Sequence, residues 1–439
     1  MSALTQTKTS QISIPSTTKA IARRIAVTLL AILAALAIVL FVAPVALLPI
    51  ATSVPAPAWI MLAVLDVALI AAMLWFRKSV ILVGAALVGM LVVTLLAVAA
   101  SQYFASTPPI TGANGDLYPN SIAALEKVNL NGSEQWISLR GVDINKPVLL
   151  FLAGGPGGSQ LVTARRALGG LEEHFVVVDW EQPGAGKSFD AVNRSTLTPE
   201  RYIDDAYALV LYLRQRFDEE KIYVLGESWG SVLGIWMAQQ HPELYHAFIG
   251  TGQMVAFLET DLIDYNFALE QAQNRGDSKK VEQLKSQGPP PYYGEGVAMK
   301  EAAFLLETYK SMNANPAIAD DGFNTLQDLA GPEYGLYDKV NWFRGVLDTL
   351  GIVMPQLWEV DLRTQATRIE VPVYFLIGRH DVNAPTILTE EYYGLLSAPH
   401  KELIWFERSG HGPWFTESDR FVQVMVELVL AQTLPAQAQ

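Results

Sequence analysis

The chain has 439 residues, a formal net charge of −13 and no cysteine. The lack of cysteine excludes disulfides, thiolate metal sites and a cysteine nucleophile. An acidic chain is poorly matched to a nucleic-acid backbone, so we expect no nucleic-acid partner. Because the chain is longer than one ordinary domain, an appendage or an insertion is expected.

The appendage is at the N-terminus. The first 105 residues carry six basic side chains and one acidic one, so the remainder carries a net charge of −18. Three apolar stretches lie among these few charges, each close to the roughly 20 residues that a bilayer-spanning helix needs. A signal peptide fits less well, since its apolar core is only about 7 to 15 residues long. We therefore predict a membrane anchor over residues 1–101, with transmembrane helices at 25–50, 58–76 and 80–101.

Basic residues beside membrane spans favour the cytoplasmic side. Arg23 and Arg24 keep the N-terminus inside, and Arg77 with Lys78 keeps the connector before the third span inside. An odd number of spans then places everything after residue 101 outside the cytoplasm. The expected location is a bacterial cell membrane, crossed several times, with the lipid bilayer as a partner and the larger part of the chain extracytoplasmic.

Residues 102–118 are rich in Pro, Gly, Ser and Thr, which is typical of a linker. Beyond them, short apolar runs alternate with helical patterns, and this rhythm predicts a doubly wound, mostly parallel α/β sheet. The expected strands are 122–130, 135–139, 147–152, 175–179, 222–225, 247–250, 373–377 and 402–406. The expected helices beside them are 160–168, 199–217, 232–240 and 420–432.

The alternation stops after residue 252. Helical stretches at 262–275 and 297–312 replace it until about residue 370. We interpret residues 253–370 as a helical cap insertion, which leaves 119–252 and 371–434 as the α/β core.

A nucleophile pattern follows the strand at 222–225. Gly226, Glu227, Ser228, Trp229 and Gly230 match G-x-S-x-G, the sharp strand-to-helix turn that exposes a reactive serine. Glycine is needed on both sides because the turn brings backbones into close contact. The alternative, an ordinary turn serine, is a poorer account when a strand precedes the motif and a helix follows it. We predict Ser228 as a nucleophile.

A serine hydroxyl needs a base to take its proton and a third group to orient that base. With this turn, the expected chain order is serine, acid, histidine. Of the six histidines, His411 meets this order in a glycine-flanked loop after the last predicted strand. Asp381 follows the strand at 373–377 and is the candidate acid, with a helix N-cap as its structural alternative. Together they predict a catalytic triad.

The negative oxygen of an acyl-transfer intermediate needs preorganised N–H donors. One is expected from the backbone of Trp229, directly after the nucleophile. The other is expected from the glycine-rich loop at 153–158, at Gly155, with Gly154 as the alternative. The segment 184–188 invites a phosphate-loop interpretation, but that motif requires glycine at the position of Glu181, so we reject nucleotide binding there. No cofactor or metal is expected.

With these motifs in place, the soluble part resembles the proline iminopeptidase family of serine α/β-hydrolases over roughly residues 116–252 and 371–433. The resemblance rests on five short motifs spread along the chain. They are the glycine-rich loop 154–158, Asp179 followed by Gly184, Gly186 and Ser188, the turn 226–230 with Trp229 after the serine, the segment 378–381, and Gly410 with His411. It implies the α/β-hydrolase fold, an acyl-enzyme and release of N-terminal residues, proline-type, from short peptides.

Two departures bear on specificity. Ala153 stands where the family usually has histidine, and residues 180–183 differ from its usual approach to the glycine turn. Family members hold the substrate's free amine with cap carboxylates. Here Glu259 is the candidate by position, among the acidic residues Glu259, Asp261, Asp264 and Glu270.

Three functions remain open from the sequence. The first is a membrane-anchored serine aminopeptidase. The second is a carboxylic-ester hydrolase or lipase-like enzyme on acyl substrates, which apolar residues of the insertion such as Phe304, Trp342 and Trp358 would allow. The third is a non-catalytic binding protein on a hydrolase fold. Such a protein would not need Ser228, Asp381 and His411 together, so the presence of all three argues against it.

The topology can be tested by protease protection. We expect protease added to cells with a permeabilised outer layer to remove the part after residue 101, because Arg77 and Lys78 hold the preceding connector inside. Protection of that part equal to the protection of a cytosolic marker would reverse the orientation.

Overall fold

The computed structural model describes residues 16–319 and 324–434. The chain divides into two compact units. One comprises Met1–Ile50 and Val54–Ala100, and the other comprises Ala51–Ser53 and Ser101–Gln439.

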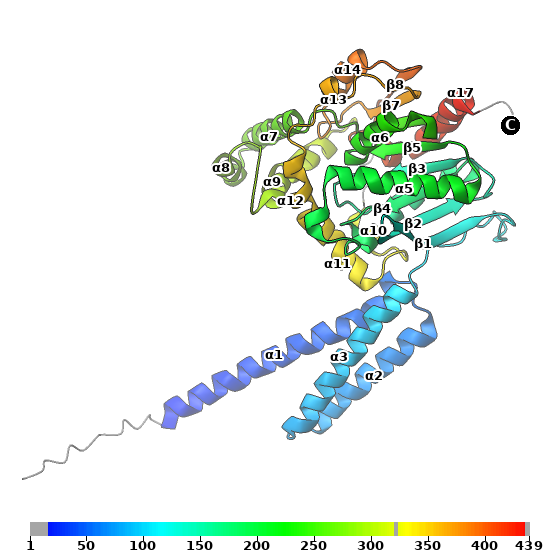
Figure 1. The fold of residues 1–439 in the computed structure, drawn as a ribbon. Coiled ribbons are helices and arrows are strands. Elements are labelled where there is room, and N and C mark those ends of the chain that lie inside the picture. The colour runs from blue at the N-terminus through cyan, green and yellow to red at the C-terminus, as the bar shows by residue number, and fades with distance from the viewer. Residues whose placement is uncertain (1–15, 320–323, 435–439) are drawn as a thin grey trace, which may run out of the picture. The chain divides into compact units, whose positions relative to one another are not determined.

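The N-terminal unit is helical (Figure 1). Its helices are α1 (Ser16–Ala51), α2 (Ala56–Trp75) and α3 (Val80–Tyr103). Among the described residues, α2 and α3 are long and apolar enough to cross a membrane, so two of the three predicted spans have the expected length and composition. The predicted span at 25–50 lies within α1, whose described apolar part, Ile38–Ala51, is shorter than a span needs. Three spans are therefore not confirmed.

The larger unit is built on an eight-stranded sheet of order β1-β2-β4-β3-β5-β6-β7-β8. β2 pairs antiparallel with both β1 and β4, and the remaining neighbours are parallel. The strands are β1 (Ile122–Leu130), β2 (Ser133–Gly141), β3 (Val148–Leu152), β4 (Val176–Glu181), β5 (Ile222–Glu227), β6 (Tyr245–Thr251), β7 (Val373–Gly378) and β8 (Lys401–Phe406). Every predicted strand is thus present, most of them longer by one to three residues.

Helices cover both faces of this sheet (Figure 1). Leu150 and Leu152 of β3 point to a core shared with α5 and α6, whereas Leu149 and Phe151 point to a second core with α4 and α16. This period of two gives buried parallel strands their continuous apolar sequence. The helices here are α4 (Leu161–Ala167), α5 (Pro199–Phe217), α6 (Trp229–Gln240), α14 (Thr386–Leu395), α15 (Pro413–Thr416), α16 (Ser418–Val424) and α17 (Ala431–Thr433), with a π-helical turn at Met425–Leu430.

Between β6 and β7 the chain is helical, as the sequence predicts. Residues 320–323 of this region lie outside the described residues. The α-helices are α7 (Phe257–Asn274), α8 (Ser278–Gln287), α9 (Val297–Asn313), α10 (Thr325–Leu329), α11 (Leu336–Arg344), α12 (Leu350–Val353) and α13 (Leu362–Gln365).

A buried ion pair joins this helical region to the α/β core. Lys187 lies in a short 3₁₀ turn after β4, and its Nζ is 2.7 Å from Oδ2 of Asp338 on α11. The side chains are only 2% and 4% exposed. Nζ also lies 4.5 Å from the centroid of the Trp136 ring on β2. A charge removed from such a pair leaves its partner buried without compensation.

We therefore expect Lys187→Met to lower the free energy of unfolding by about 3 kcal/mol or more. The double variant Lys187→Met/Asp338→Asn should recover part of that loss, because it buries no unpaired charge and keeps an oxygen that can accept from the Gly335 N–H. Chemical denaturation of the detergent-solubilised protein measures both. The control is Arg368→Met, which breaks a pair with both side chains more than half exposed and should leave stability unchanged. If Lys187→Met matched this control, the ion pair would not hold the two regions together.

Candidate active site

Ser228 occupies the tight turn that the sequence predicts. β5 ends at Glu227 and α6 begins at Trp229, and between them Ser228 has φ 56° and ψ −121°. A positive φ is unfavourable for a residue with a side chain and persists only where the surroundings enforce it. One such restraint is the Ser228 N–H, which donates to the carbonyl oxygen of Thr251 on β6 at 3.0 Å.

The two glycines of the motif are required by space. A Cβ on Gly226 would lie 2.4 Å from the carbonyl oxygen of Gly230, and a Cβ on Gly230 would lie 2.1 Å from that of Leu152. Both distances are far inside van der Waals contact with backbone atoms that cannot move aside. Only glycine at both positions lets α6 start this close to β3 and β5.

His411 and Asp381 are brought together although 30 residues separate them. They lie in loops after β8 and β7, whose carboxyl ends meet at the same sheet edge. Nδ1 of His411 is 2.9 Å from Oδ2 and 3.1 Å from Oδ1 of Asp381. The Nδ1–H therefore donates to the carboxylate, which fixes the tautomer in which Nε2 accepts a proton. This is the orienting contact that a triad requires.

The electrostatic surroundings favour the protonated form of His411. Burial lowers its pKa, but the charges of Asp381 and then Glu227 outweigh burial, so the pKa of His411 is raised above its ordinary value of 6.5. Nδ2 of Asn383 lies 3.2 Å from Nε2. Within the described part of the chain, no hydrogen bond joins Nε2 to the Ser228 hydroxyl. Such contacts often tighten only when substrate is bound.

The glycine-rich loop after β3 lies directly beside Ser228. A Cβ on Gly154 would be 3.1 Å from the Cβ of Ser228. The Gly154 N–H already donates to Oε1 of Gln160 at 3.3 Å. This engagement favours Gly155 over Gly154 as the second donor to a negative oxygen, with the backbone of Trp229 as the first.

Gln182 supports this loop and was not singled out from the sequence. Its Nε2 donates to the carbonyl oxygen of Ala153 at 3.0 Å, and its Oε1 accepts from the indole N–H of Trp229 at 2.9 Å. Gln182 thus ties the glycine loop to the first residue of α6. The available signal was its place in the segment 180–183, which departs from the family pattern.

Three carboxyl groups of the helical region form a buried cluster. Asp261 and Asp264 lie on α7 and Glu301 on α9, and they are 3%, 0% and 1% exposed. Burial raises the pKa of each. The side chains of Asp261 and Glu301 interact with each other, and the raised pKa of Glu301 allows the two carboxyl groups to share a proton. Among the described residues, no donor reaches either oxygen of Asp264, so Asp264 is the acceptor of the cluster that is open to an outside partner.

Tyr309 of α9 connects this cluster electrostatically with the His411–Asp381 pair. Its ring lies edge-on to the His411 imidazole, with centroids 6.0 Å apart. The charges of Asp381 and Asp264 both raise the pKa of its hydroxyl, after burial and Glu227. Asp381 likewise raises the pKa of Asp264. The carboxyl cluster and the His411–Asp381 pair thus share one electrostatic environment.

Glu259, the sequence candidate for amine binding, is placed differently. It lies in the first turn of α7, its side chain is 47% exposed, and Arg363 pairs with it. Arg363 also pairs with Asp361 and Glu391. The charge of Glu259 is therefore compensated at the surface. Asp261 and Asp264, two and five residues further along, point to the interior.

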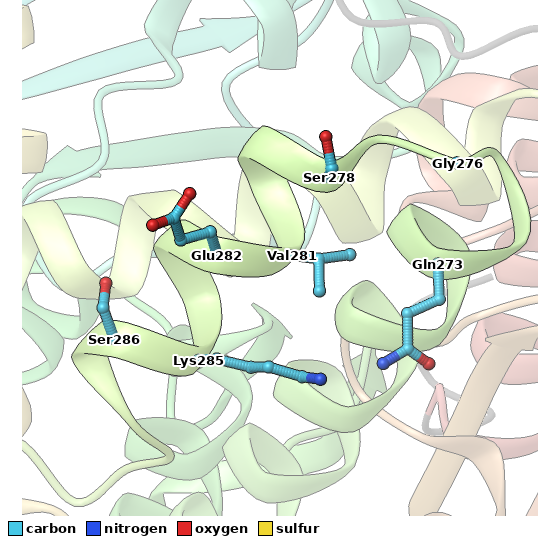
Figure 2. Close-up of a pocket in the computed structure, with 7 residues that line it drawn as sticks. All are labelled: Gln273, Gly276, Ser278, Val281, Glu282, Lys285 and Ser286. Atoms are coloured by element: carbon cyan, nitrogen blue, oxygen red, sulfur yellow. The ribbon is translucent and has the colours of Figure 1, made fainter.

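A shallow hollow lies elsewhere, between the end of α7 and α8. Figure 2 shows Gln273, Val281 and Lys285 around it. None of the sequence-predicted site residues lines it. Across the described residues, no group of three or more His, Asp or Glu side chains has an arrangement suited to a metal ion.

The family assignment follows from comparison with known proteins. Residues 147–417 match the model of the α/β-hydrolase fold family. This is more than half of the chain, and it includes Ser228, Asp381 and His411. The chain therefore belongs to the α/β-hydrolase family, and it is a hydrolase of that fold.

Two relatives by sequence and one solved structure show which hydrolases the chain is similar to. The chain is 28% identical over 314 residues to "Probable aminopeptidase YbaC" of Bacillus subtilis, covering 70% of this chain and 96% of the relative. It is 23% identical over 277 residues to a proline iminopeptidase of Heyndrickxia coagulans, covering 63% of this chain and 88% of that protein. A solved proline iminopeptidase of Mycobacterium smegmatis shares the fold, with a TM-score of 0.52 and 17% identity over 71% of this chain and 99% of its own.

We expect Ser228→Ala and His411→Ala each to lower turnover on the order of a millionfold, because nucleophile and base act as one unit. Both variants should keep the fold, as an unchanged circular dichroism spectrum would show. Reaction with a fluorophosphonate, followed by mass spectrometry of the labelled peptide, tests the nucleophile directly. Equal labelling of the Ser228→Ala protein and the parent would exclude Ser228.

Proposed function

We propose that the protein is a membrane-anchored serine aminopeptidase that releases N-terminal residues from short peptides through an acyl-enzyme at Ser228. Two kinds of observation support the proposal. The His411–Asp381 contact and the strained turn at Ser228 supply the arrangement for acyl transfer. The buried carboxyl cluster supplies a binding place for a substrate cation.

The proposed reaction begins when Nε2 of His411 takes the hydroxyl proton of Ser228. Oγ then attacks the scissile carbonyl carbon, and the backbone N–H groups of Trp229 and Gly155 bind the resulting negative oxygen. The C–N bond breaks as His411 returns the proton to the leaving amine. Water repeats the sequence on the acyl-enzyme and regenerates the Ser228 hydroxyl.

The observation that carries the aminopeptidase assignment is the cluster of Asp261, Asp264 and Glu301. A free α-amine is a cation, and burying it costs roughly several kcal/mol unless a carboxylate pairs with it. Asp264 has both oxygens without a donor from the described residues, and it interacts with Asp381 and Tyr309. In our proposal an N-terminal ammonium binds Asp264, while the adjacent carbonyl reaches Ser228.

The anchor and the domain boundaries are part of the proposal. α2 and α3 support membrane attachment by length and composition. We assign residues 1–101 to the anchor, 102–118 to a linker, 119–252 with 371–434 to the hydrolase core, and 253–370 to the cap. The basic residues of the anchor support an extracytoplasmic hydrolase.

The amine site can be tested by exchanging a carboxylate for its amide. Asp264→Asn should lower kcat/KM for amino-acid amides with a free amine on the order of a hundredfold, because a buried charge pair with the substrate is lost. Hydrolysis of neutral acyl esters should fall much less. Glu259→Gln is the matched control on the same helix, and we expect it to change neither activity, since Glu259 is half exposed and paired with Arg363.

Two results would contradict the assignment. If Asp264→Asn lowered kcat/KM equally for amides and esters, Asp264 would contribute to a step that both substrates share rather than to binding of the amine. A parent enzyme active only on esters would favour the carboxylic-ester hydrolase, the alternative that the sequence leaves open.

A further inference from the structure

The imidazole of His411 lies between two carboxyl groups. Asp381 contacts its Nδ1 edge, with Oδ2 at 2.9 Å. Glu227, the residue before Ser228, faces the opposite edge, with Oε1 3.6 Å from Nε2. Glu227 and His411 are each only 5% exposed. A triad needs the first carboxylate, and the second has no role in the reaction proposed above.

The surroundings of Glu227 hold its carboxyl group in this position. Oε2 accepts from Nε2 of Gln160 at 3.3 Å, and the same Gln160 accepts from the Gly154 N–H at 3.3 Å. A Cβ on Gly154 would lie only 2.2 Å from Oε2 of Glu227. The glycine loop can therefore approach this carboxyl group only because residue 154 has no side chain.

We propose that Glu227 is a positioning residue that stabilises the imidazolium form of His411 after the proton of Ser228 has been transferred. The inference rests on the serine-hydrolase mechanism proposed above. At 3.6 Å the contact is too long for a hydrogen bond, so Glu227 acts through its charge. Glu227 therefore does not engage Nε2–H, which can protonate the leaving group. Because the attraction exists only once His411 is charged, it lowers the barrier rather than tightening substrate binding.

The titratable groups around His411 set the sign of the pH effect. They are Asp381 from the loop after β7, Glu227 at the end of β5 and Tyr309 on α9, and the charge of Asp264 on α7 acts on Tyr309. Burial raises the pKa of Glu227, and the charge of His411 opposes that shift.

Only neutral His411 can accept the Ser228 proton, so activity falls as the pH drops through the pKa of His411. Ionised Glu227 raises this pKa. Removing the Glu227 charge should therefore move the acid limb of the pH profile to lower pH.

The test is the rate of fluorophosphonate labelling of the full-length protein as a function of pH. For Glu227→Gln, which is isosteric, we expect the midpoint of the acid limb to fall by about one pH unit and the plateau rate to fall about tenfold. Glu227→Asp moves the charge away from Nε2, so its midpoint should move in the same direction by less. Glu370→Gln is the matched control, because it makes the same substitution in an exposed pair with Arg368, and its acid limb should coincide with that of the parent.

The outcomes separate this inference from the proposed function. An acid limb that stays in place in Glu227→Gln, or that moves to higher pH in Glu227→Asp, would overturn the role of Glu227 while leaving the serine hydrolase intact. A loss confined to substrates with a free amine, with the acid limb unchanged, would also overturn it and make Glu227 an amine ligand. If the parent itself is not labelled at Ser228, the proposed function fails and this inference fails with it.

Discussion

The backbone of Ser228 is forced into a conformation that residues with side chains avoid, and the rest of the site depends on the contacts that hold it there. A strained residue costs on the order of 1–3 kcal/mol and persists only when its neighbours over-determine its position. Gly226 and Gly230 provide the space, and Thr251 fixes the amide. With the turn held, the side chain of Ser228 and the N-terminus of α6 are presented at the carboxyl edge of the sheet. The loops bearing Asp381 and His411 leave the same edge.

A second constraint is the amount of negative charge near a single imidazole. Asp381 and Glu227 flank His411, and the carboxyl cluster of the cap lies in the same electrostatic environment through Tyr309. Burial disfavours the charged forms of Glu227 and Asp264 and raises the pKa of each. Such an arrangement is tolerated where cations are bound or formed. The proposed reaction has two of them, the imidazolium and the substrate ammonium.

Periodicity and local motifs were enough to predict the sheet, its flanking helices and the candidate triad. Strands buried on both faces have a distinctive composition, and the turn at Ser228 needs glycines at fixed positions, so both signals are local in sequence. Both edge strands, β1 and β8, were predicted to within one residue, although β8 is only half-buried. The helix α14 before β8 was not predicted.

The residues to which we assign specificity in our proposal were harder to predict, because their positions depend on how helices pack. Glu259 and Asp264 are five residues apart on α7 and therefore point in different directions, a difference that the sequence of α7 shows only once its buried face is known. Glu301 comes from α9, which meets α7 only in the folded protein. Gln182 and Gln160 support the site through hydrogen bonds between distant segments. The spacing of residues along the sequence does not indicate such hydrogen bonds.

The carboxyl cluster has a consequence for which peptides the proposed enzyme would process. An acetyl or formyl group on the first residue removes the positive charge and adds a carbonyl oxygen that would face Asp264 and Glu301. The modified terminus offers no cationic donor to the oxygens of Asp264, so the proposed charge-assisted hydrogen bond would be lost in a buried site. Hydrolysis would thus depend on the chemical state of the terminus as well as on the first residue, so that an upstream deformylase or deacetylase would control access to this enzyme.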